Sequence, residues 1–254
     1  MASRAPDTPT DSTLQLLGWW ELHLDDRGVA LGRREQRLVA LLALAGRRSR
    51  LQVAGTLWPD SSEHHAMSNL RAAVFQTRQH APDLLSAQSS TLDLGAHITV
   101  DVGHLRCYAG RVADSPEAYD ATEVVAQLGE GDLLPGWYDD WVLFERERLQ
   151  HLRLRALEAV ARASLQAGRA HEATAAARAA VRIEPLHEGA NVLLVRGCLA
   201  AGSQVDAVRH FHGYRRRLEL DLGIRPSGTL AELVRPLLLP SQRKPAPAPQ
   251  RARR

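Results

Sequence analysis

The sequence contains little of what several classes of protein depend on. Aromatic residues make up 5% of the 254 residues, and the two cysteines, Cys107 and Cys198, are isolated from each other. Cysteines without motif spacing argue against a disulfide scaffold and favour a reducing cytosol. No apolar run is long enough to cross a membrane, and the first residues lack the apolar core of a signal peptide. We therefore expect a cytoplasmic protein that makes no contact with a membrane.

Residues typical of catalytic and metal sites occur only in incomplete patterns. Lys244 is the only lysine, so a Gly-x-x-x-x-Gly-Lys phosphate loop cannot occur. His187-Glu188 begins a zincin-like motif, but Asn191 stands where the second metal ligand is needed. His64 and His65 are adjacent rather than four residues apart, and no Gly-x-Ser-x-Gly nucleophile elbow is present. We expect neither an enzyme nor a bound metal or cofactor.

The net charge of +3 is distributed unevenly along the chain. The tail from Ser241 carries five positive charges and no acid, so the rest of the chain has a net charge of −2. Residues 14–104 contain nine arginines and nine acidic residues. A uniformly basic domain would be the clearer sign of nucleic-acid binding. The positions of the arginines therefore matter more than their number.

Length and composition predict two mainly helical domains. A chain of 254 residues is long enough for two cores, and alanine, leucine and arginine are abundant. We divide it into a disordered leader at 1–13, a first domain at 14–104, a helical domain at 105–240 and a disordered basic, proline-rich tail at 241–254.

The first domain contains alternating short strands and helices. Strands are expected at 14–17, 20–24 and 29–31, the last two joined by a turn at Asp25–Gly28. Helices are expected at 33–45, which ends at Gly46, and at 52–58, which ends at Pro59. Further strands follow a third helix, at 84–87, 91–94 and 98–102, with Gln88–Ser90 as a turn. Strands, three helices and a terminal hairpin are the plan of a winged helix with an N-terminal sheet.

The third helix, at 60–80, has two contrasting faces. Asp60 followed by Glu63 has the spacing of a capping box at its start. An apolar stripe repeats at helical spacing through Ala66, Leu70, Ala73, Val74 and Thr77. The opposite side carries His64, Ser68, Ala72, Phe75 and Gln79, flanked by His65, Arg71 and Gln76, with Arg78 nearer the stripe. Such a helix fits a DNA major groove, where arginine and glutamine read base edges, although an ordinary amphipathic surface helix has the same pattern.

The second half contains a repeat. Gly168 and Gly202 are 34 residues apart, the tetratricopeptide period, and Ala173 and Ala207 follow them at the same offset. Ala177 and Ala180 correspond in the same way to Phe211 and Tyr214, and the helix after Ser203 runs longer than the one after Ala170. A long helix from about 139 to 167 begins the stack, and Cys198 is expected to be a packed thiol on an apolar helix.

Both halves resemble one family. LGWWELHLDDRGVALGRREQRLVALLALAG and VAGTLWPDSSEHHAMSNLRAAV resemble the OmpR-type winged helix of the Streptomyces antibiotic regulatory proteins, which are actinobacterial transcriptional activators. GDLLPGWYDDWVLFERERLQHLRLRALEAV and FHGYRRRLELDLGIRPSGTLAEL resemble the opening and close of the bacterial transcriptional activation domain that follows it. In the close, Thr229 and Glu232 have capping-box spacing. The predicted fold is therefore mainly α with small β-sheets, a winged helix-turn-helix followed by a tetratricopeptide-like domain.

The resemblance implies a transcriptional activator that binds promoter repeats and helps to recruit RNA polymerase holoenzyme. The residues placed at double-stranded promoter DNA are Ser68, Arg71, Phe75, Gln76, Arg78 and Gln79, with Arg33, Arg34, Arg47, Arg48 and Arg50 at helix ends and connectors. The loop formed by Pro59, Asp60, Ser61 and Ser62 is the candidate polymerase contact. The helical half is expected to contact polymerase or to fix two protomers side by side on DNA. Such an activator works in the cytoplasm, on the nucleoid.

The chain also departs from the family pattern. Where a tryptophan, an arginine, a leucine and an arginine are usual, it has Phe75, Gln76, Thr77 and Gln79. The two glutamines remove positive charge from the DNA side, which lowers the counterion-release contribution to binding. The alternative hypothesis is therefore a tetratricopeptide-type protein-interaction module whose winged helix binds DNA weakly or not at all.

Overall fold

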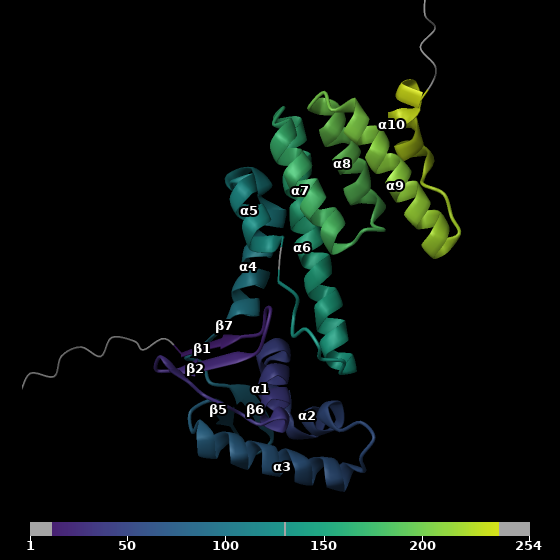
Figure 1. Ribbon diagram of the computed structural model, residues 1–254. Coiled ribbons are helices and arrows are strands. Elements are labelled where there is room, and N and C mark those ends of the chain that lie inside the picture. Colours follow the sequence, from purple (N-terminus) through teal and green to yellow (C-terminus); the bar gives the residue numbers. More distant parts are fainter. Residues whose placement is uncertain (1–11, 130, 239–254) are drawn as a thin grey trace, which may run out of the picture.

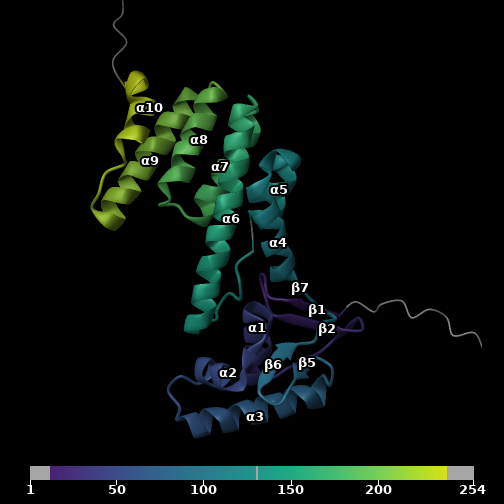
Figure 2. The ribbon, with the colours of Figure 1, turned by 180° about the vertical axis from the view of Figure 1, so that it is seen from behind.

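The computed structural model describes residues 12–129 and 131–238 and is elongated (Figure 1). The strands and three helices form one end, and stacked helices form the other, as the view from behind also shows (Figure 2). One cluster of buried apolar side chains extends through both parts, from Leu14 to Val234. The predicted fold class, a winged helix followed by a tetratricopeptide-like helical domain, is confirmed.

A four-stranded sheet begins the winged-helix part. Its strands, in spatial order, are β3 (Arg27–Gly28), β2 (Glu21–Leu24), β1 (Ser12–Gln15) and β7 (Ile98–Val100). Leu24 pairs with Arg27 across a two-residue turn, in which Asp25 and Asp26 have positive φ of 50° and 60°. Such turns need positive φ at both positions, which aspartate tolerates. The tighter turn explains why the strand expected at 29–31 lies at 27–28 instead.

Three helices and a second sheet complete this part. The helices are α1 (Arg33–Ala45), α2 (Arg50–Leu57) and α3 (Glu63–His80), and the sheet has the order β4 (Arg48–Ser49), β6 (Thr91–Leu94), β5 (Leu85–Ala87). α2 begins two residues earlier than expected because Ser49 caps it. The Ser49 hydroxyl accepts from the Gln52 backbone N–H at 3.2 Å, and the Gln52 side chain accepts from the Ser49 N–H at 3.1 Å. This reciprocal pair is a capping box.

The helical part contains more elements than the sequence predicted. Its elements are α4 (Asp101–Asp114), the short 3-10 helix η1 (Pro116–Ala118), α5 (Ala121–Leu128), α6 (Asp140–Gln166), α7 (Ala170–Ile183), α8 (Glu188–Ala200), α9 (Gln204–Leu222) and α10 (Gly228–Leu238). α6 is the expected long helix, whereas α4 and α5 are additional to the prediction. The strand expected at 98–102 ends at Val100, and α4 follows it directly, so position 104 lies within a helix.

The repeat is visible in the backbone. Gly168 and Gly202 follow α6 and α8 with φ of 74° and 76°. In both turns the next residue closes the helix in the same way: Arg169 N–H donates to Ser164 O and Ser203 N–H to Cys198 O, each at 2.8 Å. A glycine at this position reaches the left-handed conformation without the strain that a Cβ would add. The 34-residue period therefore marks two equivalent helix pairs, α6–α7 and α8–α9.

The two ends of the chain differ in part from the prediction. Ser12 and Thr13, which we assigned to the disordered leader, belong to β1, and the rest of the leader and the tail at 241–254 lie outside the described residues. The capping box predicted at Thr229 and Glu232 is wrong because α10 already begins at Gly228. Glu232 pairs instead with Arg235 at 2.8 Å, one turn further along. None of the helices in the described part of the chain is long and apolar enough to span a membrane.

Hydrogen bonds between distant segments fasten the two parts to each other. The Asp101 carboxylate, at the start of α4, accepts from the backbone N–H groups of Leu16 and Leu17 at 2.9 and 2.8 Å. Leu16 O in turn accepts from Leu134 N–H at 2.8 Å. These bonds, charge-assisted at Asp101, fix the end of β1 against the segment that leads into α6. The winged helix is thus held in one orientation on the helical part.

Two half-buried arginines reinforce the same junction. Arg106 of α4 donates to Leu44 O of α1 at 3.0 Å and to Glu145 of α6 at 2.5 Å. Arg37 of α1 donates to Leu57 O at 2.8 Å and pairs with Asp139, the residue before α6. Both guanidinium groups therefore connect helices of the winged part to the first turns of α6.

Candidate nucleic-acid interface

Helix α3 lies along the free end of the winged part, away from the helical part (Figure 1). Its N-cap is Ser62, whose hydroxyl accepts from the His65 backbone N–H at 3.4 Å. The predicted cap at Asp60 is wrong, because Ser61 N–H bonds to Trp58 O at 3.1 Å and keeps residues 59–61 in a turn before the helix. Serine and aspartate are equally good caps, so composition alone could not choose between them. Glu63 then lies in the first turn, where the helix dipole favours an acid.

The two faces of α3 are those that the periodicity predicts. Its buried residues are Ala66, Leu70, Ala73, Val74 and Thr77. The exposed residues of its outward face and flanks include Ser68, Arg71, Phe75, Gln76, Arg78 and Gln79. Phe75 is 58% exposed and adds a large aromatic ring to this face. The outward face thus offers an aromatic ring, amides and guanidinium groups to solvent.

Thr77 shows how the stripe accommodates a hydroxyl. The side chain is fully buried, and its Oγ1 donates to Ala73 O, one turn earlier, at 2.8 Å. This bond satisfies the hydroxyl within the helix, so no external partner is needed. We expect Thr77→Val to change the free energy of unfolding by less than about 1 kcal/mol, since shape is kept and a satisfied local bond contributes little.

Thr77→Ser is the matched comparison. It keeps the hydroxyl and deletes a buried methyl group, which should lower the stability by about 1 kcal/mol. Urea denaturation of the full chain measures both variants. A larger loss for Thr77→Val than for Thr77→Ser would contradict this account of the hydroxyl.

The arginines of α3 are free to meet a ligand. Across residues 12–129 and 131–238, Arg71 and Arg78 make neither an ion pair nor a side-chain hydrogen bond, although ion pairs occur on many other helices. Arg71 lies on the flank of the outward face, and Arg78 follows two turns later near the end of the helix. An unpaired guanidinium offers its full set of donors to base edges or phosphates.

The hairpin β5–β6 forms a wing beside α3. Its turn, Gln88–Ser90, is exposed, and Gln88 N–H closes it by donating to Thr91 O at 3.0 Å. Arg50 N–H at the start of α2 donates to Ser90 O at 2.9 Å, and β4 pairs with β6 at Arg48 and Ser49. The basic segment Arg47–Arg50 and the tip of the wing are therefore held together by backbone hydrogen bonds.

The arginines predicted around α3 fall into different environments. Arg34 is exposed, Arg48 donates to the carbonyl of Arg47 at 2.9 Å, and Arg50 is half-buried at the start of α2. Arg47 is committed to Asp93 of the wing at 3.2 Å. Arg33 is directed elsewhere, with its guanidinium 3.7 Å from the ring centroid of Trp137. Stacking on tryptophan places Arg33 at the junction with the helical part rather than beside the wing.

The loop Pro59–Ser62 faces a groove that the sequence did not reveal. The groove has a volume of about 610 Å³ and lies between this loop and the start of α6. Tyr138 and Phe144, which line its far side, are 80% and 66% exposed. The Arg37–Asp139 ion pair fixes α6 at this place. The cluster of aromatic residues around Trp137 in the sequence could have indicated this groove. Only the fold, however, shows which of these residues are buried and which are exposed.

The described residues contain no group of histidine, cysteine and acidic side chains that could hold a metal ion. The chemistry of the α3 face is that of recognition: donors and acceptors on an exposed helix, with a wing beside it. Its geometry suits a groove about as wide as an α-helix with side chains, which is the major groove of double-stranded DNA.

Comparisons with known proteins agree with this arrangement. Residues 103–238 match the family described as bacterial transcriptional activator domain. Two proteins named regulatory protein AfsR are similar: the one from Streptomyces griseus is 29% identical over 85% of this chain, and the one from Streptomyces coelicolor is 28% identical over 84%. This chain spans only 24% and 23% of their lengths.

A solved structure shares the fold. It is that of Mycobacterium tuberculosis EmbR in complex with a low affinity phosphopeptide, and the TM-score is 0.64 at 22% sequence identity. The similarity covers 89% of this chain and 65% of the other. The common architecture therefore includes both the winged part and the helical part.

Proposed function

The chain belongs to the bacterial transcriptional activator domain family and has the two-part plan of a Streptomyces antibiotic regulatory protein, and from this premise we propose that it is a sequence-specific DNA-binding transcriptional activator. The observation that carries the proposal is the outward side of α3, where the exposed side chains of Arg71, Gln76 and Gln79 make no hydrogen bond or ion pair in the described chain. We place its action in the cytoplasm, on the nucleoid.

In this proposal α3 lies in the major groove of promoter DNA. Arg71 is assigned to a base edge, because an exposed arginine on a helix in the major groove can form two hydrogen bonds with guanine. Ser68 and Ala72 are small and exposed, which allows the helix to approach closely. Arg34, Arg48, Arg50 and Arg78 are assigned to phosphates, where they fix position without carrying sequence information. Arg33 is not assigned to DNA, since Trp137 occupies its guanidinium.

The polymerase contact is proposed at the loop Pro59–Ser62 together with the groove beside it. Exposed Tyr138 and Phe144 add apolar surface to a polar loop, a combination that is enriched in protein interfaces. Arg37 donates to Leu57 O, just before the loop, and pairs with Asp139, just before α6. The winged part and the helical part would therefore present this surface together. The helical part would also fix two protomers side by side on repeated DNA sites.

A gel-shift of the full chain on the promoter region upstream of its own gene tests the DNA-binding part. The four arginines assigned to phosphates predict a slope of log affinity against log salt near −3.6, so affinity should fall by about 10²-fold between about 50 and 200 mM salt. Scrambled DNA of the same composition should bind more weakly at every salt concentration. Equal affinity for both DNAs would contradict sequence-specific recognition.

The alternative function is a protein-interaction module with little or no DNA binding. The equal numbers of arginines and acidic residues at 14–104 favour it, as does exposed Phe75 on the α3 face. In the same gel-shift such a module would bind neither DNA and would show no salt dependence. That result would favour this alternative and overturn the activator proposal.

A further inference from the structure

A pocket of about 630 Å³ lies in the helical part, between α7, α8 and α9. These helices are at the opposite end of the molecule from α3 (Figure 1). Pockets of this size hold small organic molecules. The lining residues that matter most are Arg178 and Arg182 of α7, Leu194 and Cys198 of α8, and Tyr214 and Arg217 of α9.

The pocket is built by one face of each helix. Leu194 and Cys198 are four residues apart on α8, as are Arg178 and Arg182 on α7 and Gly213 and Arg217 on α9. Residues at this spacing lie on the same side of a helix. Leu194, Cys198 and Tyr214 are nearly fully buried and form an apolar floor. Burial raises the pKa of the Cys198 thiol, so the floor stays uncharged there.

Positive charge collects at the rim of this pocket. Four arginines line it, against a single carboxylate, Asp206. That carboxylate is already paired with Arg209 at 3.1 Å. Arg178, Arg182 and Arg217 are exposed and have no ion-pair partner within the described part of the chain. Three unpaired guanidinium groups around one hollow repel one another, and an anion between them would relieve that repulsion.

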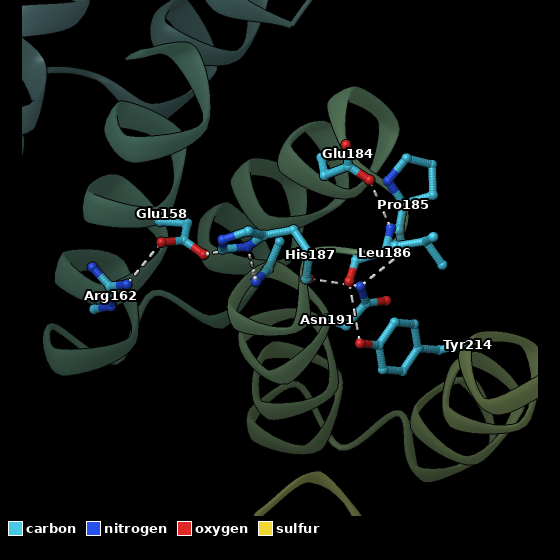
Figure 3. Close-up of polar contacts among 9 residues, drawn as sticks. Glu158, Arg162, Glu184, Pro185, Leu186, His187, Asn191 and Tyr214 are labelled. Atoms are coloured by element: carbon cyan, nitrogen blue, oxygen red, sulfur yellow. Dashed lines mark hydrogen bonds and ion pairs between the residues drawn. The ribbon is translucent and has the colours of Figure 1, made fainter. Parts of the chain in front are cut away.

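A fixed polar group lies at the inner end of the pocket. Asn191 is fully buried, and its amide nitrogen donates to Pro185 O at 3.1 Å and to His187 O at 2.8 Å, as Figure 3 shows. The Asn191 oxygen must therefore be the acceptor of its remaining bond, which comes from Nε2 of His210 at 2.8 Å. Nδ1 of His210 then carries no proton while the ring is neutral.

The imidazole of His210 responds to the charge around it. Its pKa lies below the ordinary value because the ring is buried and because Arg178 and Arg217 both raise the positive potential there. Two arginines from different helices thus act on one ring that borders the pocket. Both arginines and His210 line the same pocket.

We propose that this pocket binds a small organic anion, with its phosphate or carboxylate group between Arg178, Arg182 and Arg217 and its apolar body on the floor of Leu194, Cys198 and Tyr214. Guanidinium groups bind both kinds of oxyanion through charge-assisted, often bidentate hydrogen bonds. The proposal rests on the helical part alone and is independent of DNA binding by α3.

Calorimetric titration of the full chain with phenyl phosphate and with benzoate tests the site, with benzyl alcohol as the neutral control. At least one anion should bind with a Kd below about 1 mM, and the tighter of the two identifies the preferred head group. Benzyl alcohol should bind at least about tenfold more weakly, since it lacks the charge-assisted bonds. Failure of both anions to bind would overturn the proposal.

Two variants and a control locate the binding. Arg178→Gln/Arg217→Gln should weaken anion binding at least about tenfold, whereas Arg216→Gln, which removes an exposed charge next to the pocket residue on the same helix, should not. A Cβ at Gly213 meets open space, so Gly213→Leu should fill the pocket without a clash and block binding. Because leucine is the better helix former, this variant should melt no lower than the parent. Unchanged binding in both variants would place the anion elsewhere and refute the site.

Discussion

Arg71→Ala is expected to reduce the affinity of the full chain for its cognate promoter by roughly 5- to 150-fold, because a base-edge contact provides about 1–3 kcal/mol of discrimination. Affinity for scrambled DNA should fall less. In that complex the protein contacts mainly phosphates, and Arg71 is only one of several positive charges near them. Arg71 has no intramolecular partner in the described chain, so its removal leaves no buried group unpaired and should not alter the fold. Competition gel-shifts at one salt concentration measure both affinities.

A control separates this effect from general loss of charge. Arg155 is exposed in the second half of α6, and Arg155→Ala removes the same charge from the helical part instead of the winged part. It should leave both affinities within about twofold, because exposed charges separated by more than a Debye length of about 8 Å are largely screened. If Arg71→Ala weakens specific and nonspecific binding equally, Arg71 is only a phosphate contact, and α3 is turned differently in the groove.

Local periodicity was sufficient to predict the two faces of α3. The five buried positions and the exposed arginine and glutamines follow from helical spacing, because the helix packs on one side only. The exact start was not predictable, since Asp60, Ser61 and Ser62 are all good caps in succession and a backbone bond from Ser61 to Trp58 decides among them. The start of α2, in contrast, was available from the sequence, because Ser49 followed three residues later by Gln52 has the capping-box spacing that the structure shows.

Contacts between distant segments account for what the sequence did not reveal. Arg33 looked like a phosphate contact at a helix start, but Trp137, more than 100 residues later, lies under its guanidinium. Asp101 lay within the strand predicted at 98–102, but it begins α4, and its carboxylate accepts from the backbone N–H groups of Leu16 and Leu17. The pocket between α7 and α9 likewise needs Arg178 and Arg217 on one side of two separate helices. A one-dimensional pattern identifies which side of a helix is buried, but not which helix covers it.

Restoring charge to α3 is expected to strengthen DNA binding. Gln76 and Gln79 are both exposed and face away from the buried stripe of Leu70 and Thr77. Each arginine that gains a phosphate contact should steepen the slope of log affinity against log salt by about 0.9, so the double variant should add about 1.8. Over a change from about 50 to 200 mM salt, this amounts to about tenfold more loss of affinity than in the parent.

The fold should tolerate the double variant, Gln76→Arg/Gln79→Arg. Arginine is a good helix former, and exposed helix substitutions usually change stability by less than about 0.5 kcal/mol. Gln127→Arg/Gln166→Arg is the matched control, because it makes the same two replacements at exposed positions of α5 and α6, in the helical part. Binding isotherms at several salt concentrations, with a thermal melt of each variant, measure the effect. If the α3 variant melts normally and its slope is no steeper than that of the control, this face of α3 does not meet phosphates. The exposed arginine and glutamines would then belong to a protein-binding surface, and the interaction-module function would replace the activator.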